Sequence, residues 1–244
     1  NSATDVSFVR LAIDDSCNLK CPSCRDRLVF HKSGSAFDRG IRLADRINDW
    51  LAVHDRPVQV HIGSDGDPFA SHIYRHFMEH TPNRNTIKYS LMTNGLMFEE
   101  FHGRVPNIMS NLDELAVSID GATKSTYEAL RLGGRWDKIK SNLQSIADSK
   151  VKNNFTFSLH MVVQQENWSE MPDMVRLAEQ YGADQVYFNK IKDWNTGLDH
   201  SRQTFSDLEE FKSMFREIDG RPERFENAKK YRIKGFDNDA VKLS

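Results

Sequence analysis

The three cysteines of this chain all fall within one stretch of eight residues, Cys17-Asn-Leu-Lys-Cys21-Pro-Ser-Cys24, and none follows in the rest of the 244-residue sequence. Three thiolates spaced C-x3-C-x2-C in one loop can hold three irons of a [4Fe-4S] cluster and leave the fourth iron without a protein ligand. The pattern therefore predicts a metal centre whose coordination an outside molecule can complete.

Two other interpretations of these cysteines stay open. A zinc site with three thiolates and one imidazole could use His31, although zinc ligands usually come as two separated pairs and the sequence contains no second pair. A redox disulfide could use Cys21-Pro-Ser-Cys24, but that motif needs a helix directly behind it to lower the thiol pKa. Residues 25–35 are typical of a loop. The spacing favours the iron-sulfur interpretation.

The remaining composition is that of a globular protein, with 39% hydrophobic and 28% charged residues and no apolar run long enough for a membrane span. A formal net charge of -2 gives no support for nucleic-acid binding. The basic run at 229–234 is short enough to be a solvated helix face. The sequence shows no secretory leader, and three unpaired cysteines agree with a reducing compartment. We therefore expect a cytoplasmic protein that binds neither nucleic acid nor a membrane.

Short apolar and β-branched runs alternate with longer amphipathic segments, which is typical of a parallel α/β sheet in one large domain. Six strands are predicted, at 8–13, 58–62, 89–92, 115–119, 155–163 and 186–189. Helices are predicted at 39–53, 71–80, 98–102, 136–148, 171–181 and 206–218.

Polar motifs follow four of these strands at the point where each strand ends. Cys17 follows the first strand, residues 65–68 the second, 93–95 the third and 120–121 the fourth. Ligands of parallel α/β proteins bind at the carboxyl ends of the strands, where the loops are free to vary. The four motifs therefore indicate one shared site on one rim of the sheet.

Taken in order, these motifs resemble the radical S-adenosylmethionine (SAM) superfamily. C-x3-C-x2-C after a first strand is the signature of that superfamily, and Gly63-Ser64-Asp65-Gly66-Asp67-Pro68 stands where its members have a Gly-Gly-Glu-Pro loop. The similarity continues through 91–96 and through 117–122 with the downstream run 127–131. The last combination is similar to the branch with a C-terminal SPASM or twitch extension, which includes peptide-modifying maturases.

The resemblance implies a partial (β/α)6 TIM-type barrel with parallel strands over residues 1–235, holding one [4Fe-4S] cluster on Cys17, Cys21 and Cys24. It implies SAM as the second cofactor, chelated to the open iron through its methionine amine and carboxylate. Reductive cleavage would give methionine and a 5′-deoxyadenosyl radical that abstracts hydrogen from a peptide or small-molecule substrate. The electron would come from a donor such as flavodoxin or ferredoxin.

The resemblance also assigns roles around SAM, but it nominates no catalytic acid or base. The 65–68 loop would meet the SAM ammonium through carbonyls and a carboxylate, Ser118 and Asp120 the ribose or methionine end, and Arg131 the carboxylate. Phe188 would offer the adenine a stacking surface. The predicted SAM contacts are Asp65, Gly66, Asp67, Pro68, Asn94, Ser118, Asp120, Arg131 and Phe188.

Several of these residues also have a plainer interpretation. The 65–68 loop is typical of an Asp-capped turn, and Asn94-Gly95 is a strong turn former. Arg131 is equally consistent with a solvated helix end, and Phe188 with core packing. We expect His61 and His160 to face the barrel interior as proton or hydrogen-bond partners, although a core histidine is the commoner outcome.

The chain departs from the family pattern in three respects. Ser23 stands where many members have an aromatic residue beside the adenine, so Phe30 or Phe188 would have to supply that packing. The 65–68 loop carries two aspartates. No cysteine follows Cys24, so auxiliary clusters have no ligands. We expect either a minimal one-cluster enzyme or a fragment in which residues 236–244 begin a further extension. The alternatives are a non-catalytic zinc-stabilised interaction module and a degenerate relative that binds a cluster without cleaving SAM.

Overall fold

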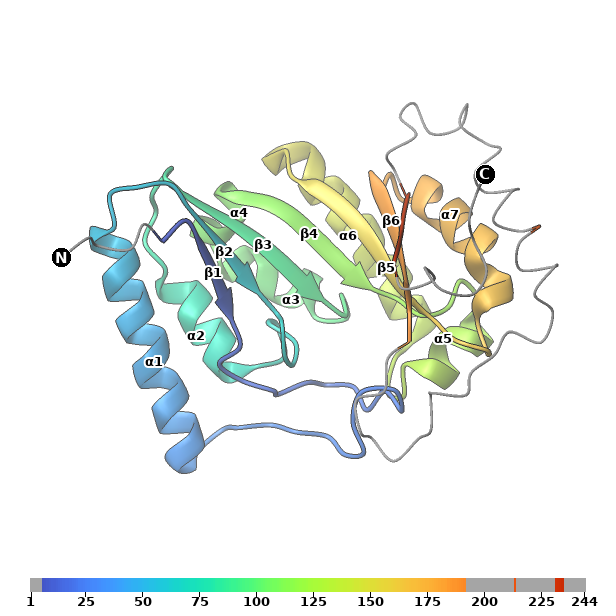
Figure 1. The fold of residues 1–244 in the computed structure, drawn as a ribbon, viewed down its shortest axis with the longest axis horizontal. Helices are drawn as coiled ribbons and strands as arrows, with labels where there is room; N and C mark the ends of the chain where they lie inside the picture. The colour runs from blue at the N-terminus through green and yellow to red at the C-terminus, as the bar shows by residue number, and fades with distance from the viewer. Residues whose placement is uncertain (1–5, 192–212, 214–230, 235–244) are drawn as a thin grey trace.

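The computed structural model describes residues 6–191, Ser213 and 231–234. Its strands form one sheet in the order β1-β2-β3-β4-β5-β6-β7, and each strand pairs in parallel with the next (Figure 1). The strands are β1 Phe8–Leu11, β2 Val58–Ile62, β3 Ile87–Thr93, β4 Leu112–Ser118, β5 Thr156–Val163, β6 Gln185–Lys190 and β7 Tyr231–Lys234. Within the described residues the sheet is open, because β1 and β7 are its two edges.

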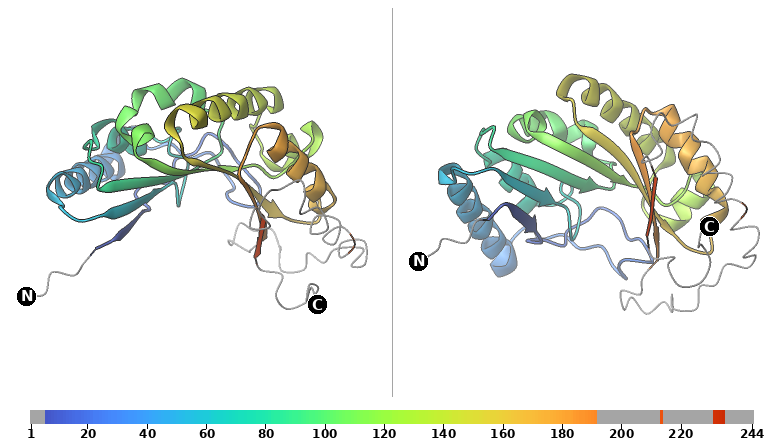
Figure 2. Two further views of the ribbon diagram at one scale, coloured as in Figure 1. Left: turned by 90° about the horizontal axis from the view of Figure 1, so that it is seen from above. Right: turned by 45° about the horizontal axis from the view of Figure 1, so that its top comes forward.

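The helices lie on the convex side of this curved sheet, as Figure 2 shows. They are α1 Gly34–Val53, α2 His72–His80, α3 Phe98–Phe101, α4 Pro106–Ser110, α5 Lys124–Leu130, α6 Trp136–Asn153 and α7 Met171–Gln180, with 3-10 turns η1 His102–Arg104 and η2 Trp168–Glu170. None of the helices in the described part of the chain has both the length and the apolar character needed to cross a membrane.

The two faces of the sheet differ in polarity. In β2, Val58, Val60 and Ile62 are buried, whereas Gln59 and His61 between them are partly exposed. Successive strand side chains point to opposite faces, so the apolar set packs under the helices and the polar set faces the concave side. The carboxyl ends of the strands and their loops are thereby held on a rigid layer.

The predicted partial (β/α)6 barrel of parallel strands is confirmed. All six predicted strands are present as β1 to β6, and five predicted helices correspond to α1, α2, α3, α6 and α7. The sixth, at 206–218, lies outside the described residues except for Ser213. The short helices α4 and α5 were not predicted. Each begins with a local signal, Pro106 in the first turn of α4 and the side chain of Thr123 capping α5.

The interpretation of the basic run 229–234 as a helix face was wrong, because its described part, Tyr231–Lys234, is strand β7. Four residues alternating between apolar and basic carry too weak a period to distinguish a strand from a helix. Val186 of β6 pairs with Tyr231 and Asn189 with Lys234. The neighbouring strand edge supplies the hydrogen-bonding partners that four residues lack on their own.

Candidate functional site

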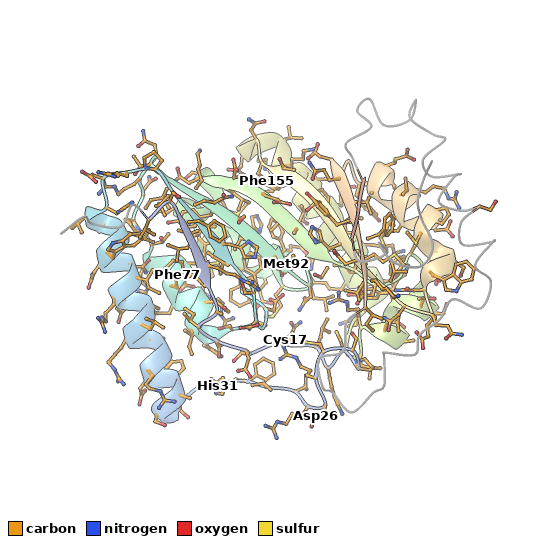
Figure 3. All side chains as sticks on the ribbon, viewed as in Figure 1. Cys17, Asp26, His31, Phe77, Met92 and Phe155 are labelled. Carbon is orange, nitrogen blue, oxygen red and sulfur yellow. The ribbon has the colours of Figure 1, made fainter. Side chains whose placement is uncertain are left out.

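The loop between β1 and α1 carries all three cysteines and runs across the carboxyl ends of the strands, where Figure 3 places Cys17. The Cys17 amide donates to the carbonyl of Val29 at 3.0 Å, which closes the loop on itself. The amides of Cys24 and Arg25 both donate to the Cys21 carbonyl, at 2.9 and 3.0 Å, and make a tight turn. Cys17 and Cys21 are buried, whereas Cys24 is exposed.

The loop after β2 packs backbone to backbone against the cysteine loop. The Asp67 amide donates to the carbonyl of Ser16 at 2.8 Å. Gly66 has a φ of +70°, and a Cβ built on it would lie 2.5 Å from the same carbonyl oxygen. Only a glycine fits that approach without displacing main chain. The two loops that the sequence assigned to the metal and to SAM are therefore in direct contact.

We expect Gly66→Ala to separate these loops. The added Cβ meets backbone atoms and the φ is unfavourable for alanine, so the free energy of unfolding should fall by about 1–3 kcal/mol. SAM binding to the reconstituted protein should weaken, measured by calorimetry. Gly182→Ala is the matched control, because Gly182 has a φ of +65° but nothing within 4 Å of a built Cβ. Equal SAM affinity in both variants would show that the 65–68 loop does not contribute to SAM binding.

The Asp67 carboxylate points into the protein and accepts four hydrogen bonds. Its Oδ1 accepts from the amides of Phe69 and Ala70, both at 3.0 Å. Its Oδ2 accepts from Thr93 Oγ1 at 2.8 Å and from the Asn94 amide at 2.7 Å. Burial raises the pKa of Asp67, and these four donors oppose the rise. The carboxylate assigned to the SAM ammonium is thus occupied in linking two rim loops, as in the Asp-capped turn interpretation. The Asp67 carbonyl also accepts from the amides of Ala70 and Ser71, whereas Asp65 is exposed.

Asn94 is also turned inward. Its Nδ2 donates to Asn18 Oδ1 at 2.8 Å and to Cys17 Sγ at 3.7 Å, and its Oδ1 accepts from the Leu96 amide at 3.0 Å. The residue is 5% exposed. It forms the expected turn after β3, but its side chain supports the cysteine loop instead of reaching outward.

Asp120 and Arg131 form a buried ion pair, with Arg131 Nε 2.7 Å from Asp120 Oδ2 and side chains 11% and 2% exposed. The second oxygen of Asp120 accepts from the Val162 amide at 2.9 Å. Although burial acts to lower it, the pKa of Arg131 is raised by Asp120 and Cys21. Arg131 is the C-cap residue of α5, but its interpretation as a solvated helix end is wrong. Ser118, the last residue of β4, is partly exposed.

The thiols of Cys17 and Cys21 lack the lowered pKa that a redox motif needs. Burial raises the pKa of Cys17 to about 11 and also raises that of Cys21, so without a metal both stay protonated at neutral pH. No helix follows Cys24 until α1 begins at Gly34. A cationic metal centre ionises such thiols by binding them. A single loop with three thiols, two of them buried, therefore fits the ligand set of an iron-sulfur cluster.

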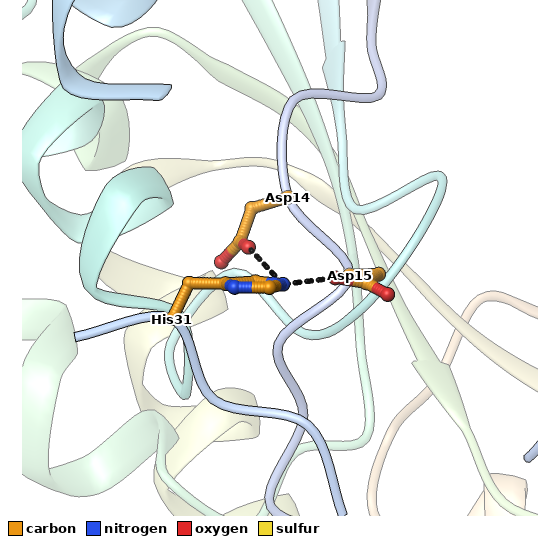
Figure 4. A group of neighbouring side chains, drawn as sticks. All are labelled: Asp14, Asp15 and His31. Atoms are coloured by element: carbon orange, nitrogen blue, oxygen red, sulfur yellow. Dashed lines mark hydrogen bonds and ion pairs between the residues drawn. The ribbon is translucent and has the colours of Figure 1, made fainter. Parts of the chain in front are cut away.

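The His31 side chain lies beside two carboxylates. Its Nε2 lies 2.8 Å from Asp15 Oδ1 and 3.9 Å from Asp14 Oδ1 (Figure 4). These three side chains form a group whose possible ligand atoms lie within 4.8 Å of one another, and that group contains no cysteine. Asp14 also accepts a hydrogen bond from Ser71 Oγ, at the start of α2. The zinc alternative therefore has no imidazole from His31 beside the thiols.

Phe188 is fully buried in the core, as the plainer interpretation held. We expect Phe188→Ala to lower the free energy of unfolding by about 3–5 kcal/mol through the cavity it leaves. The SAM affinity of the folded protein should not change, measured by calorimetry below the unfolding transition. Phe30→Ala is the comparison, because Phe30 is 42% exposed on the cysteine loop and should cost little stability. Weaker SAM binding by Phe188→Ala alone would restore its predicted role against the adenine.

His61 and His160 both lie on the concave face of the sheet. His61 Nδ1 is 2.9 Å from Ser90 Oγ. Ser158 Oγ lies 3.1 Å from His160 Nε2 and donates to Glu114 Oε1 at 3.0 Å. This face therefore offers hydrogen-bonding groups next to the cysteine-bearing rim.

Two residues with clear roles at the rim were not predicted. Glu170 accepts hydrogen bonds from the amides of Ala122 and Thr123 and from the hydroxyls of Thr123 and Thr126, which fixes the start of α5. Arg25 donates to the Asp15 carbonyl and to the sulfur of Cys24. A single glutamate or arginine in a polar stretch gives no sequence signal of its partner.

An α/β partial barrel with a three-cysteine loop over the carboxyl ends of its strands defines a class of metal-dependent proteins. Comparison with protein families narrows the class, since the model described as "Radical SAM superfamily" matches residues 13–178. The chain belongs to the radical SAM superfamily. Membership implies SAM and an iron-sulfur cluster as its cofactors.

Among curated proteins, the chain is 27% identical over 140 residues to a probable GTP 3',8-cyclase of Methanococcus maripaludis, covering 55% of this chain and 43% of that protein. It is 25% identical over 174 residues to a probable GTP 3',8-cyclase of Halobacterium salinarum, covering 70% and 46%. The chain thus spans less than half the length of these relatives.

Solved structures share its fold. SuiB of Streptococcus suis, bound to its precursor peptide SuiA, superposes with a TM-score of 0.62 and 13% identity, covering 94% of this chain and 49% of SuiB. Native anSMEcpe with bound AdoMet gives a TM-score of 0.63 and 18% identity, covering 95% and 65%. At these identities the likeness concerns the fold.

Proposed function

We propose that this protein is a radical SAM enzyme that binds one [4Fe-4S] cluster through Cys17, Cys21 and Cys24. Its reaction is the reductive cleavage of SAM to methionine and a 5′-deoxyadenosyl radical, which abstracts hydrogen from a peptide or small-molecule substrate. The observation that carries the proposal is the contact between the cysteine loop and the 65–68 loop at the carboxyl ends of the strands. The cluster, when bound, supplies the electron for the cleavage.

The residues of this chain have distinct tasks in that reaction. The three thiolates hold the cluster and leave one iron to SAM. The Asp65 carboxylate and the loop carbonyls other than that of Asp67 are acceptors for the SAM ammonium. Ser118 and the paired Arg131 face the other polar groups of SAM. The concave face around His61 and His160 holds the substrate hydrogen near the cleaved bond and limits access of water.

The comparisons support two substrate classes. SuiB is bound to a precursor peptide, which favours a peptide. The curated relatives carry the name of a nucleotide cyclase, which favours a small molecule.

Free thiols in the described residues support a reducing, cytoplasmic location, with flavodoxin or ferredoxin as the electron donor. We assign residues 1–235 to the radical SAM core and 236–244 to a tail or the start of an extension.

Anaerobic reconstitution with iron and sulfide tests this function. A brown protein that releases 5′-deoxyadenosine and methionine from SAM, only with dithionite, is the expected result. A colourless protein with one stoichiometric zinc would support the interaction module instead. A brown protein that releases no nucleoside would support a degenerate relative.

A further inference from the structure

The sulfur of Cys17 accepts hydrogen bonds from two groups of the protein. The Leu19 amide donates to it at 3.4 Å, and Asn94 Nδ2 donates at 3.7 Å. Both donors are rigidly placed, the first by the loop itself. The second is held in place because the backbone amide of Asn94 donates to the Asp67 carboxylate and the Asn94 side chain hydrogen-bonds to Asn18 and Leu96.

The sulfur of Cys24 has a cationic donor. Arg25 Nη2 lies 3.8 Å from Cys24 Sγ, and Nη1 of the same guanidinium donates to the Asp15 carbonyl at 2.7 Å. The carbonyl bond orients the guanidinium toward the sulfur, although Cys24 is exposed.

Cys21 lies close to a second guanidinium. The Lys20 amide donates to the Leu132 carbonyl at 2.9 Å, so the cysteine loop is attached next to Arg131. Each of the three thiols therefore has a different donor or cation beside it, and two of these neighbours are arginines.

Donors to ligand sulfurs have a known physical effect on an iron-sulfur cluster. Reduction adds one negative charge to the cluster and its thiolates, and cations or N–H groups aimed at the sulfurs stabilise that charge. Water partly stabilises the negative charge on an exposed sulfur, but water molecules are mobile and are not fixed in one orientation. A fixed guanidinium beside the exposed Cys24 replaces that solvent with a directed charge.

We propose that Arg25 and Asn94 are positioning residues that bind the ligand sulfurs of Cys24 and Cys17 and raise the reduction potential of the cluster. This inference rests on the proposed function, because it requires a cluster on these cysteines. It adds the residues that decide how readily the bound cluster accepts an electron.

The test is a redox titration of the reconstituted protein with dithionite, followed by electron paramagnetic resonance in the absence of SAM. Arg25→Gln should make the one-electron reduction about tenfold less favourable, which corresponds to a midpoint lower by about 59 mV. Asn94→Leu, which removes an uncharged donor, should lower the midpoint by less. Arg25→Lys should recover part of the loss, because lysine keeps the positive charge but lacks the two N–H groups with which the guanidinium reaches the Asp15 carbonyl and the Cys24 sulfur.

Arg27→Gln is the matched control, because Arg27 is an exposed arginine of the same loop for which no cysteine contact is found in the described residues. Its midpoint should equal that of the unmodified protein. Equal midpoints in Arg25→Gln and Arg27→Gln, with full iron in both, would overturn the inference and leave the proposed function intact. Loss of iron from Arg25→Gln alone also counts against it, because a residue that tunes the potential is not needed for assembly. Failure of the unmodified protein to bind iron would overturn the proposed function itself.

Discussion

Replacing Cys17, Cys21 or Cys24 singly with alanine should abolish both cluster binding and SAM cleavage. A cube held by three thiolates loses a third of its protein ligands, and the buried neighbours Cys17 and Cys21 are costly to ionise without the metal. Even the mutation of a residue that only hydrogen-bonds to a metal ligand typically costs about 10–100-fold in metal affinity or activity. We therefore expect more than about a 100-fold loss of 5′-deoxyadenosine release, together with loss of the brown colour and of iron.

Ser23→Ala is the control for these variants. Ser23 lies between Cys21 and Cys24 and is partly exposed, so its removal changes the same turn without touching a ligand. Iron content and nucleoside release should stay close to those of the unmodified protein. If colour, iron and SAM turnover persisted in all three alanine variants, the cysteines would not be the ligands and the proposed function would fall.

Removing the Asp67 carboxylate should destabilise the fold, whereas removing the Asp65 carboxylate should not. Asp67→Ala leaves four buried donors without their acceptor, and each unsatisfied buried group costs about 1–3 kcal/mol. We expect the free energy of unfolding of the metal-free protein to fall by at least about 3 kcal/mol, measured by urea denaturation. Asp67→Asn should also destabilise, since its amide nitrogen would face hydrogen-bond donors.

Asp65→Asn is the matched variant, two residues away in the same loop. Asp65 is exposed, so the change should alter stability by no more than about 0.5 kcal/mol. SAM should bind more weakly, because the loop loses an outward negative charge. The opposite pattern, a stability loss for Asp65→Asn and none for Asp67→Ala, would show that the loop is arranged differently from this structure.

The fold could be predicted closely because its signals are local. Alternation in Val58–Ile62 and the run Thr156–Val163 specify strands over a few residues, and the amphipathic period of 136–148 specifies a helix. The strands lie side by side in chain order, as βαβ units place successive strands. The strand β7 was missed because four residues have too short a period, and pairing with β6 decides their conformation.

The site could be predicted only in part. The motifs were expected together on one rim, and the structure brings the cysteine loop, the 65–68 loop, Asn94 and Asp120 to the carboxyl ends of the strands. The direction of each side chain was not predictable. Asp67 and Asp65 are the same residue type in one turn, but one is buried under four donors and the other is exposed.

By itself the sequence predicted an iron-sulfur centre and determined the kind of fold, because the spacing of three thiols and the periods of apolar residues are properties of neighbouring residues. Only the tertiary structure decided that His31 turns to Asp14 and Asp15, and that Arg25 and Asn94 turn to sulfurs. Asn94 is far along the chain from Cys17. Arg25 follows Cys24 directly, but its guanidinium is oriented by the carbonyl of Asp15, and His31 also contacts Asp15. Hydrogen bonds and ion pairs depend on which atoms packing brings within about 3–4 Å of one another, and no local pattern encodes that distance.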